Sequence, residues 1–285
     1  MIAQSQISKL SNRLLKEQGG RRIPESVLER DYCIAWFLIG LSRMPLREKL
    51  VFKGGTALKR CHFAEYRFSE DMDFTLSGNL SFDALKGELE KVYEAVKKSS
   101  GITFRFIRED SASHLNSYTF YLGYEGPLPV MTAVREVKVD VTLKECLVTP
   151  VEELPILKSY PEFSDLPEDS SIRVYSLAEI ATEKTVALLD RARTEPRDLF
   201  DLWHLTTTSK SVDLAQIQDA IQQKLKFRGK TLDEVRGEFD KKEARLKKTW
   251  DTRLSAQMGE LPEFEGVYRA VKRELRRAAI TEAEG

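Results

Sequence analysis

The chain of 285 residues is long enough to bury a substantial core in one large domain or two modest ones, which excludes a disulfide-stapled miniprotein. Hydrophobic residues make up 41% of the chain and charged residues 32%, with only 15 Gly and 10 Pro, which excludes collagen-like and low-complexity disordered chains. Because 45 basic residues balance 45 acidic ones, no global field draws the surface onto nucleic acid or an acidic membrane, and any nucleic-acid binding must depend on a local patch.

The cysteines indicate a reducing compartment, and the apolar segments give no sign of export or membrane insertion. Cys33, Cys61 and Cys146 are far apart and form no C-x-x-C pair, which argues against a disulfide framework or a zinc site. The most apolar early stretch, residues 34–41, is too short to span a bilayer and lacks the features of a signal peptide. We therefore expect a cytoplasmic protein without membrane association.

The first half of the chain alternates between predicted helices and predicted strands. A helix with apolar residues at helical spacing follows Pro24, a residue suited to helix entry. A short strand then runs into the turn Gly54-Gly55-Thr56, after which a helix restarts, and later β-like runs predict a mixed sheet. The predicted helices are residues 25–43 and 82–98, and the predicted strands are residues 49–53, 72–76, 102–107, 118–124 and 134–143.

The pattern changes near residue 175. Residues 150–170 hold four prolines and an acidic excess, which predicts a surface connection before a short strand at 172–175. Beyond it the periodic segments are helical, beginning with a capping-box pattern from Ser176 to Glu179. The predicted helices are residues 176–190, 197–207, 213–225, 231–257 and 264–279. We therefore predict an α/β (α+β) fold, with a mixed-sheet domain and N-terminal helices over residues 1–175 and an all-helical domain over residues 176–285.

Two aspartates suggest a metal site. Asp71 and Asp73 are two residues apart, so on a strand their carboxylates point to the same face, flanked by apolar Met72 and Phe74. Like charges this close repel each other unless a cation neutralises them, and Mg²⁺ prefers oxygen ligands. We interpret the pair as ligands of Mg²⁺ or Mn²⁺; the competing interpretation is a polar strand edge.

The glycine turn and a third aspartate complete the pattern. A turn without Cβ atoms at a helix start lets backbone N–H groups of Gly54 and Gly55 approach phosphate oxygens, and Thr56 adds a hydroxyl donor. Asp140 supplies a third carboxylate on the same side if its strand lies beside that of Asp73. Taken alone, the glycines also suit an ordinary tight turn, and Asp140 also suits the solvent face of an alternating strand.

These residues, in this order and spacing, resemble the nucleotidyltransferase fold, and within it the AbiEii-type toxins of abortive-infection and toxin–antitoxin systems, with the MenT toxins as relatives. The resemblance covers roughly residues 50–205. The segments that carry it are Lys53-Gly54-Gly55-Thr56-Ala57-Leu58, Arg67-Phe68-Ser69-Glu70-Asp71-Met72-Asp73-Phe74, Val139-Asp140-Val141, Glu183-Lys184 and Arg197-Asp198-Leu199-Phe200-Asp201-Leu202.

The resemblance implies a Mg²⁺-dependent enzyme that transfers a nucleotide from an NTP to an RNA acceptor, the tRNA 3′ end in the best-understood relatives. Such a protein is a toxin that blocks translation, and its antitoxin is a separate protein encoded nearby. The implied catalytic residues are Asp71, Asp73, Asp140, Lys184 and Asp198, with the first three as metal ligands. The implied nucleotide-binding residues are Gly54, Gly55, Thr56 and Lys184, so the helical domain contributes Lys184 and Asp198 to the site.

Several alternatives stay open at this point. Lys184 also suits an i,i+4 ion pair on a solvated helix face, Asp198 suits a charge at a helix N-terminus, and Asp201 competes with Asp198 for the functional role. The same chemistry serves a protein or antibiotic acceptor, and the fold also suits a non-catalytic binding module. The basic run at residues 268–277 suits a solvated helix face or a surface that follows an RNA backbone.

Overall fold

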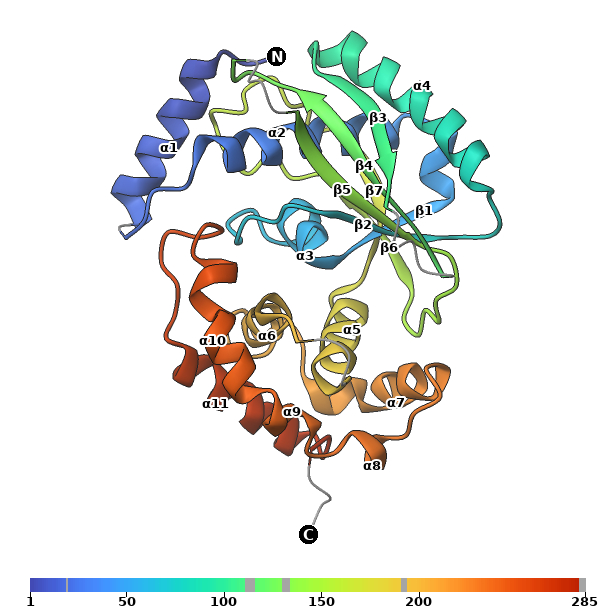
Figure 1. Ribbon diagram of the computed structural model, residues 1–285, viewed down its shortest axis with the longest axis vertical. Coiled ribbons are helices and arrows are strands. Elements are labelled where there is room, and N and C mark those ends of the chain that lie inside the picture. The colour runs from blue at the N-terminus through green and yellow to red at the C-terminus, as the bar shows by residue number, and fades with distance from the viewer. Residues whose placement is uncertain (19, 111–115, 130–133, 191–193, 282–285) are drawn as a thin grey trace. The chain divides into compact units, whose positions relative to one another are not determined.

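A mixed β-sheet organises the part of the chain that precedes Ser176 (Figure 1). The structure is a computed structural model that describes residues 1–18, 20–110, 116–129, 134–190 and 194–281. Seven strands of these residues lie in the order β3-β4-β5-β2-β1-β7-β6; β1 is parallel to β7 and β2 to β5, and the other neighbours are antiparallel. The strands are β1 (Leu50–Lys53), β2 (Met72–Leu76), β3 (Thr103–Glu109), β4 (Ser117–Glu125), β5 (Arg135–Thr142), β6 (Val151–Pro155) and β7 (Ser171–Tyr175).

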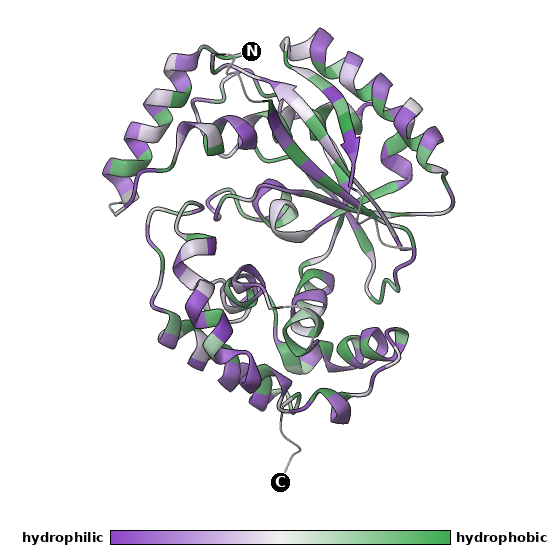
Figure 2. Ribbon diagram, in the orientation of Figure 1, coloured by the Kyte–Doolittle hydropathy of each residue, from purple (hydrophilic) through white to green (hydrophobic). Residues whose placement is uncertain are grey.

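Helices pack against the apolar face of this sheet (Figure 1). Strand residues that alternate with the polar ones, such as Phe52, Phe74 and Val139, are buried there. Helix α2 is apolar on nearly all sides and is therefore buried along most of its length, whereas α4 alternates hydrophilic and hydrophobic residues (Figure 2). The helices are α1 (Gln4–Gln18), α2 (Glu25–Ser42), α3 (Gly54–Ala57) and α4 (Phe82–Ser100), with a 3₁₀ turn at Pro45–Glu48 and a π-helical turn at Leu58–His62.

The rest of the described chain is helical. Ser176 caps α5 by accepting a hydrogen bond from the backbone N–H of Glu179, as its sequence pattern predicts. The helices are α5 (Leu177–Leu189), α6 (Pro196–Trp203), α7 (Gln218–Phe227), α8 (Leu232–Val235), α9 (Glu238–Lys241), α10 (Glu243–Leu254) and α11 (Phe264–Arg277), with a π-helical turn at His204–Thr208 and a 3₁₀ turn at Leu214–Ile217. The predicted mixed-sheet region followed by a helical region is thereby confirmed.

The chain divides into two units, each made of separate segments. The first unit comprises Met1–Glu145, Val151–Tyr175 and Gln257–Gly259. The second comprises Cys146–Pro150, Ser176–Ala256 and Glu260–Gly285. The first unit therefore includes Gln257–Gly259 from the helical part of the chain, and the second includes Cys146–Pro150 from the part that forms the sheet.

Two predictions of local structure are wrong. The expected connection at 150–170 contains strand β6, an edge strand that pairs with β7 and ends at Pro155, where a missing backbone donor does no harm. The expected long helix at 231–257 is three shorter helices; Gly237 takes a left-handed conformation (φ 78°) and separates α8 from α9, and Lys242 separates α9 from α10. Within the described ranges, no helix combines the length and apolar character needed to cross a bilayer.

Candidate active site

A polar row crosses the middle of the sheet at right angles to the strands. Thr119 on β4 is the register partner of Asp140 on β5, Asp140 of Asp73 on β2, and Asp73 of Lys53 on β1. Directly opposed residues share a face of the sheet, so both carboxylates lie on the face opposite the buried valines and phenylalanines. The strand of Asp140 therefore does lie beside that of Asp73, which was the condition for a third carboxylate.

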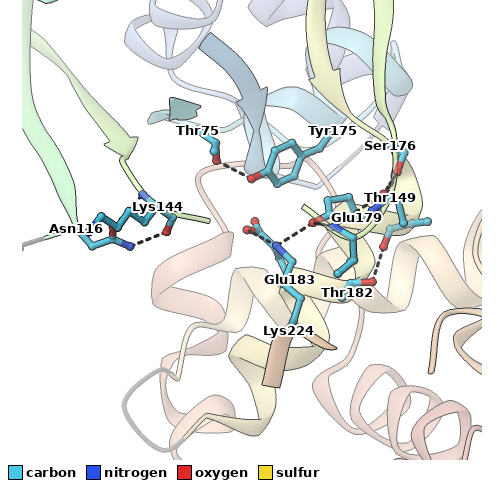
Figure 3. Close-up of polar contacts among 12 residues, drawn as sticks. Thr75, Asn116, Lys144, Thr149, Tyr175, Ser176, Glu179, Thr182, Glu183 and Lys224 are labelled. Atoms are coloured by element: carbon cyan, nitrogen blue, oxygen red, sulfur yellow. Dashed lines mark hydrogen bonds and ion pairs between the residues drawn. The ribbon is translucent and has the colours of Figure 1, made fainter. Parts of the chain in front are cut away.

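The two ends of this row are fixed by polar and aromatic contacts. The Thr119 hydroxyl donates to Oδ2 of Asp140 over 3.0 Å. Lys53 is buried, and its Nζ lies 5.6 Å from the ring centroid of Tyr175 on the neighbouring strand β7. The Tyr175 hydroxyl in turn lies 2.5 Å from Oγ1 of Thr75 (Figure 3). Sequence reasoning missed Tyr175, because only strand pairing brings it beside Lys53.

The glycine turn lies against the carboxylate of Asp73. Gly54 has a φ of 81°, and a Cβ atom built on it would lie 2.7 Å from Oδ2 of Asp73. Only glycine combines this conformation with this close approach. The Thr56 hydroxyl donates to the backbone carbonyl of Asp71, so it ties the turn to the segment that carries both aspartates.

An arginine covers the second glycine of the turn. A Cβ atom on Gly55 would lie 2.6 Å from Nη2 of Arg67. Nη1 of Arg67 donates to Oε1 of Gln257 over 2.8 Å and to the carbonyl of Phe68 over 3.2 Å. The backbone N–H of Phe68 also donates to the Gln257 carbonyl. Gln257 is thus a support of this turn that no local sequence signal indicates, since it lies far along the chain.

A fully buried lysine supports the segment that leads to Asp71. Nζ of Lys59 lies 4.3 Å from the ring centroid of Phe68 and 4.8 Å from that of Tyr160. It donates to the Tyr160 hydroxyl over 2.9 Å and to the Tyr66 carbonyl over 3.3 Å. Burial lowers the pKa of this ammonium from 10.5 to about 8, because the charged form loses its hydration.

In the second unit, Lys184 on α5 lies between two carboxylates of α6. Its Nζ is 2.6 Å from Oδ1 of Asp198 and 2.9 Å from Oδ2 of Asp201. The Asp201 side chain is fully buried and that of Asp198 is 13% exposed. The lysine therefore takes part in a cluster between two helices, and the structure pairs both aspartates with it.

The carboxylates suit a hard cation that binds together with a substrate. Among the residues that the structure describes, no group of three or more His, Cys, Asp or Glu side chains could hold a metal ion. Mg²⁺, however, is usually held by one or two carboxylates together with phosphate oxygens of the substrate. The register pair Asp73 and Asp140, with Asp71 two residues before Asp73, supplies oxygen donors of this kind.

The basic run predicted as a helix lies in α11, whose apolar side is buried. Several of its cations have partners within the second unit. Lys272 pairs with Asp240 over 2.8 Å, and Arg277 pairs with Asp213 over 2.8 Å. Part of the charge of this helix is therefore used inside the fold.

Comparison with solved structures identifies proteins that share this fold. No curated protein matches the sequence. Among solved structures, MenT4, a nucleotidyltransferase toxin from Mycobacterium tuberculosis H37Rv, superposes with a TM-score of 0.64 at 18% identity over 99% of this chain and 94% of its own. JHP933 from Helicobacter pylori gives a TM-score of 0.56 at 17% identity over 90% of this chain and 93% of its own. At these identities the two structures show a shared fold.

The family itself follows from the sequence profile. The profile described as "Nucleotidyl transferase AbiEii toxin, Type IV TA system" matches residues 36–273, which include the glycine turn, the three aspartates of the sheet and the Lys184 cluster. This match covers most of the chain. The chain therefore belongs to the AbiEii family of nucleotidyltransferase toxins of type IV toxin–antitoxin systems.

Proposed function

We propose that this toxin transfers a nucleoside monophosphate from an NTP to a hydroxyl of an RNA, with the 3′ end of tRNA as the acceptor. The observation that carries the proposal is the pairing of Asp73 with Asp140 beside the Gly54 turn. Membership of the family already implies an NTP substrate and an antitoxin partner. The acceptor, the metal and the roles of individual residues are what we propose here.

The triphosphate binds at the glycine turn. Backbone N–H groups of Gly54, Gly55 and Thr56, at the start of α3, donate to its oxygens. Lys184 places its ammonium toward the charge that develops on the departing pyrophosphate. Asp198 holds that ammonium in position through the 2.6 Å contact.

Asp73 and Asp140 would hold Mg²⁺, or Mn²⁺, with Asp71 as a further oxygen donor beside the bound triphosphate. When bound, the metal lowers the pKa of the acceptor hydroxyl and stabilises the negative charge of the in-line transition state. A bond then forms between the acceptor oxygen and the α-phosphorus, the bond from that phosphorus to pyrophosphate breaks, and the hydroxyl proton passes to solvent. Thr119 keeps the Asp140 carboxylate oriented through its 3.0 Å hydrogen bond.

Extension of the tRNA 3′ end prevents aminoacylation and so blocks translation, which accounts for toxicity. The site would act in the cytoplasm, where NTPs and tRNA are present. A cognate antitoxin encoded nearby would neutralise it. All three statements depend on transfer of a nucleotide to tRNA, which one experiment tests.

That test follows the label from the nucleotide. The purified protein is incubated with Mg²⁺ and each of four α-labelled NTPs, in parallel with total tRNA, a protein mixture or an aminoglycoside, and with Asp73→Asn as the matched inactive variant. We expect label from one or a few NTPs in the tRNA fraction, removable by digestion from the 3′ end, and none with the variant. Label in protein or aminoglycoside would overturn the acceptor. Metal-dependent NTP binding without any transfer would indicate a non-catalytic module.

A further inference from the structure

A second lysine cluster contacts another side of the helix that carries Lys184. Lys224 on α7 is fully buried, and its Nζ lies 2.8 Å from Oε1 of Glu179 and 3.4 Å from Oε1 of Glu183, both on α5 (Figure 3). We call these three residues the Lys224 cluster. Glu179 is itself almost fully buried, and Glu183 is 17% exposed.

The carboxylate of Glu179 is bound on several sides. Its Oε2 accepts hydrogen bonds from the backbone N–H and the hydroxyl of Thr149, both at 2.8 Å (Figure 3). It also accepts one from the backbone N–H of Val148 at 3.1 Å. The Thr149 hydroxyl also lies 2.8 Å from that of Ser176. The sequence pattern predicts that Glu179 turns back to the helix N-cap; instead it joins α5 to the segment Cys146–Pro150.

The cluster defines the rotation of α5 about its own axis. Residues four apart in an α-helix share a face, so Glu179 and Glu183 point together toward Lys224. Lys184 is the next residue along, about 100° further round the helix. Its ammonium meets Asp198 and Asp201 on that other side. A rotation of α5 that released Glu179 and Glu183 would therefore swing Lys184 as well.

Stability alone does not account for this arrangement. A buried ion pair often adds little net stability, because the charges lose their hydration, and apolar residues of similar volume can replace it without loss. What charged partners add is a defined geometry, since Lys224, Thr149 and Val148 all bind α5 through the carboxylate of Glu179.

We propose that Lys224 is a positioning residue: by binding Glu179 and Glu183 it fixes the orientation of α5, and with it the direction in which Lys184 presents its ammonium. The inference rests on the proposed role of Lys184 in nucleotide transfer. It assigns to the reaction a residue of α7 that has no place in the sequence motifs of the site.

The test compares two buried lysines of the second unit. Lys224→Met removes the cluster. Lys242→Met is the control, because Lys242 is also buried and donates to the backbone carbonyls of Ala187 and Asp190 at the end of α5. The double variant Glu179→Gln/Lys224→Met avoids leaving a buried carboxylate without its cation and guards against a misfolded single variant. Thermal unfolding and NTP-binding stoichiometry give the folded fraction of each protein.

We expect Lys224→Met and the double variant to lower kcat at least about tenfold, because a displacement of about 1 Å at a reacting group costs up to about 100-fold. KM for the NTP changes little, since the glycine turn is untouched. Lys242→Met lowers the unfolding temperature but keeps kcat. In both Lys224 variants, hydrogen exchange at residues 146–150 accelerates. A wild-type kcat in folded Lys224→Met, or an equal loss in Lys242→Met, would overturn the proposal.

A second comparison separates this inference from the proposed function. Under single-turnover conditions, Lys224→Met is introduced into the Lys184→Ala background. If Lys224 acts through Lys184, the double variant matches Lys184→Ala within about twofold, whereas independent effects add. A wild-type protein that transfers no nucleotide, or a fully active Lys184→Ala, refutes the proposed function. Activity that depends on Lys184 and not on Lys224 refutes the inference alone.

Discussion

Asp73 on β2 and Asp140 on β5 are register partners in a parallel pair of strands, so two carboxylates from distant parts of the chain stand side by side on one face of the sheet. Lys53, the partner of Asp73 on the other side, is the nearest cation by register. Such a pair is unfavourable in an apo protein, because like charges at neighbouring positions repel each other. A bound cation would relieve this repulsion between the two carboxylates.

Asp73→Asn and Asp140→Asn should each lower nucleotide transfer by more than about 100-fold, since even residues that only orient metal ligands are worth about 10- to 100-fold. Each variant should unfold at the wild-type temperature or slightly above it, because one charge of the pair is gone. Transfer assays check the loss of activity, and thermal unfolding in metal-free buffer checks the unfolding temperature. Near wild-type transfer by either variant would contradict the metal assignment.

Gly54→Ala should affect both stability and activity. The residue keeps a positive φ, which costs about 1–3 kcal/mol for a non-glycine residue, and its new Cβ meets Oδ2 of Asp73. Gly78→Ala is the matched control, because Gly78 also has a positive φ (87°) but has nothing within 4 Å of its added Cβ. Denaturant unfolding should show a loss of stability in both variants, larger in Gly54→Ala because of the added contact with Asp73, and transfer should fall only in Gly54→Ala.

Lys184→Ala should lower kcat by about 100-fold or more, the usual cost of removing one preorganised group that stabilises transition-state charge. The effect should persist at saturating NTP, because the lysine acts on the developing charge of the leaving group. Steady-state kinetics over a range of NTP concentrations separates kcat from KM. A change confined to KM would make Lys184 a binding residue instead.

Lys59 should make the stability of the wild type depend on alkaline pH. Its pKa is about 8 in the folded protein and near 10.5 when the chain unfolds, so between these values the unfolded chain binds more protons. The free energy of unfolding contributed by this group therefore rises with pH in that window, by about 3 kcal/mol at most.

The measurement compares the wild type with Lys59→Met by urea unfolding from neutral pH to about pH 10. Taking the difference between the two proteins cancels the groups they share, including buried thiols whose ionisation acts in the opposite direction. We expect the wild type to gain stability relative to Lys59→Met as the pH rises through 8. A flat difference would mean that the buried ammonium keeps its ordinary pKa.

Much of the fold was accessible from local pattern. The predicted strand 72–76 coincides with β2, and the helix predicted at 82–98 is α4 extended by two residues, because apolar spacing and a serine cap are local signals. The turn at Gly54 was also predictable, since two glycines between a predicted strand and a predicted helix mark a turn.

What local pattern could not supply was pairing across distance. Nothing near Asp140 specifies that β5 lies parallel to β2, and nothing near Tyr175 or Gln257 indicates contact with Lys53 or Arg67. Glu179 is a case in which a local pattern is present but distant residues determine the contact. Its position after Ser176 fits a capping box, but a buried cation on α7 and the backbone of Thr149 bind its carboxylate instead.

Because Gln257–Gly259 belongs to the first unit and Cys146–Pro150 to the second, the chain cannot be cut at residue 175 without dividing both units. A fragment that stopped there would leave Arg67 and the Phe68 amide without their Gln257 partners, and a fragment that began there would lack the Thr149 and Val148 donors of the Glu179 carboxylate. Recombination between relatives would have to exchange several separated segments at once to keep both sets of contacts. A split at residue 175 would therefore remove contacts that support the glycine turn and contacts that support the helix of Lys184.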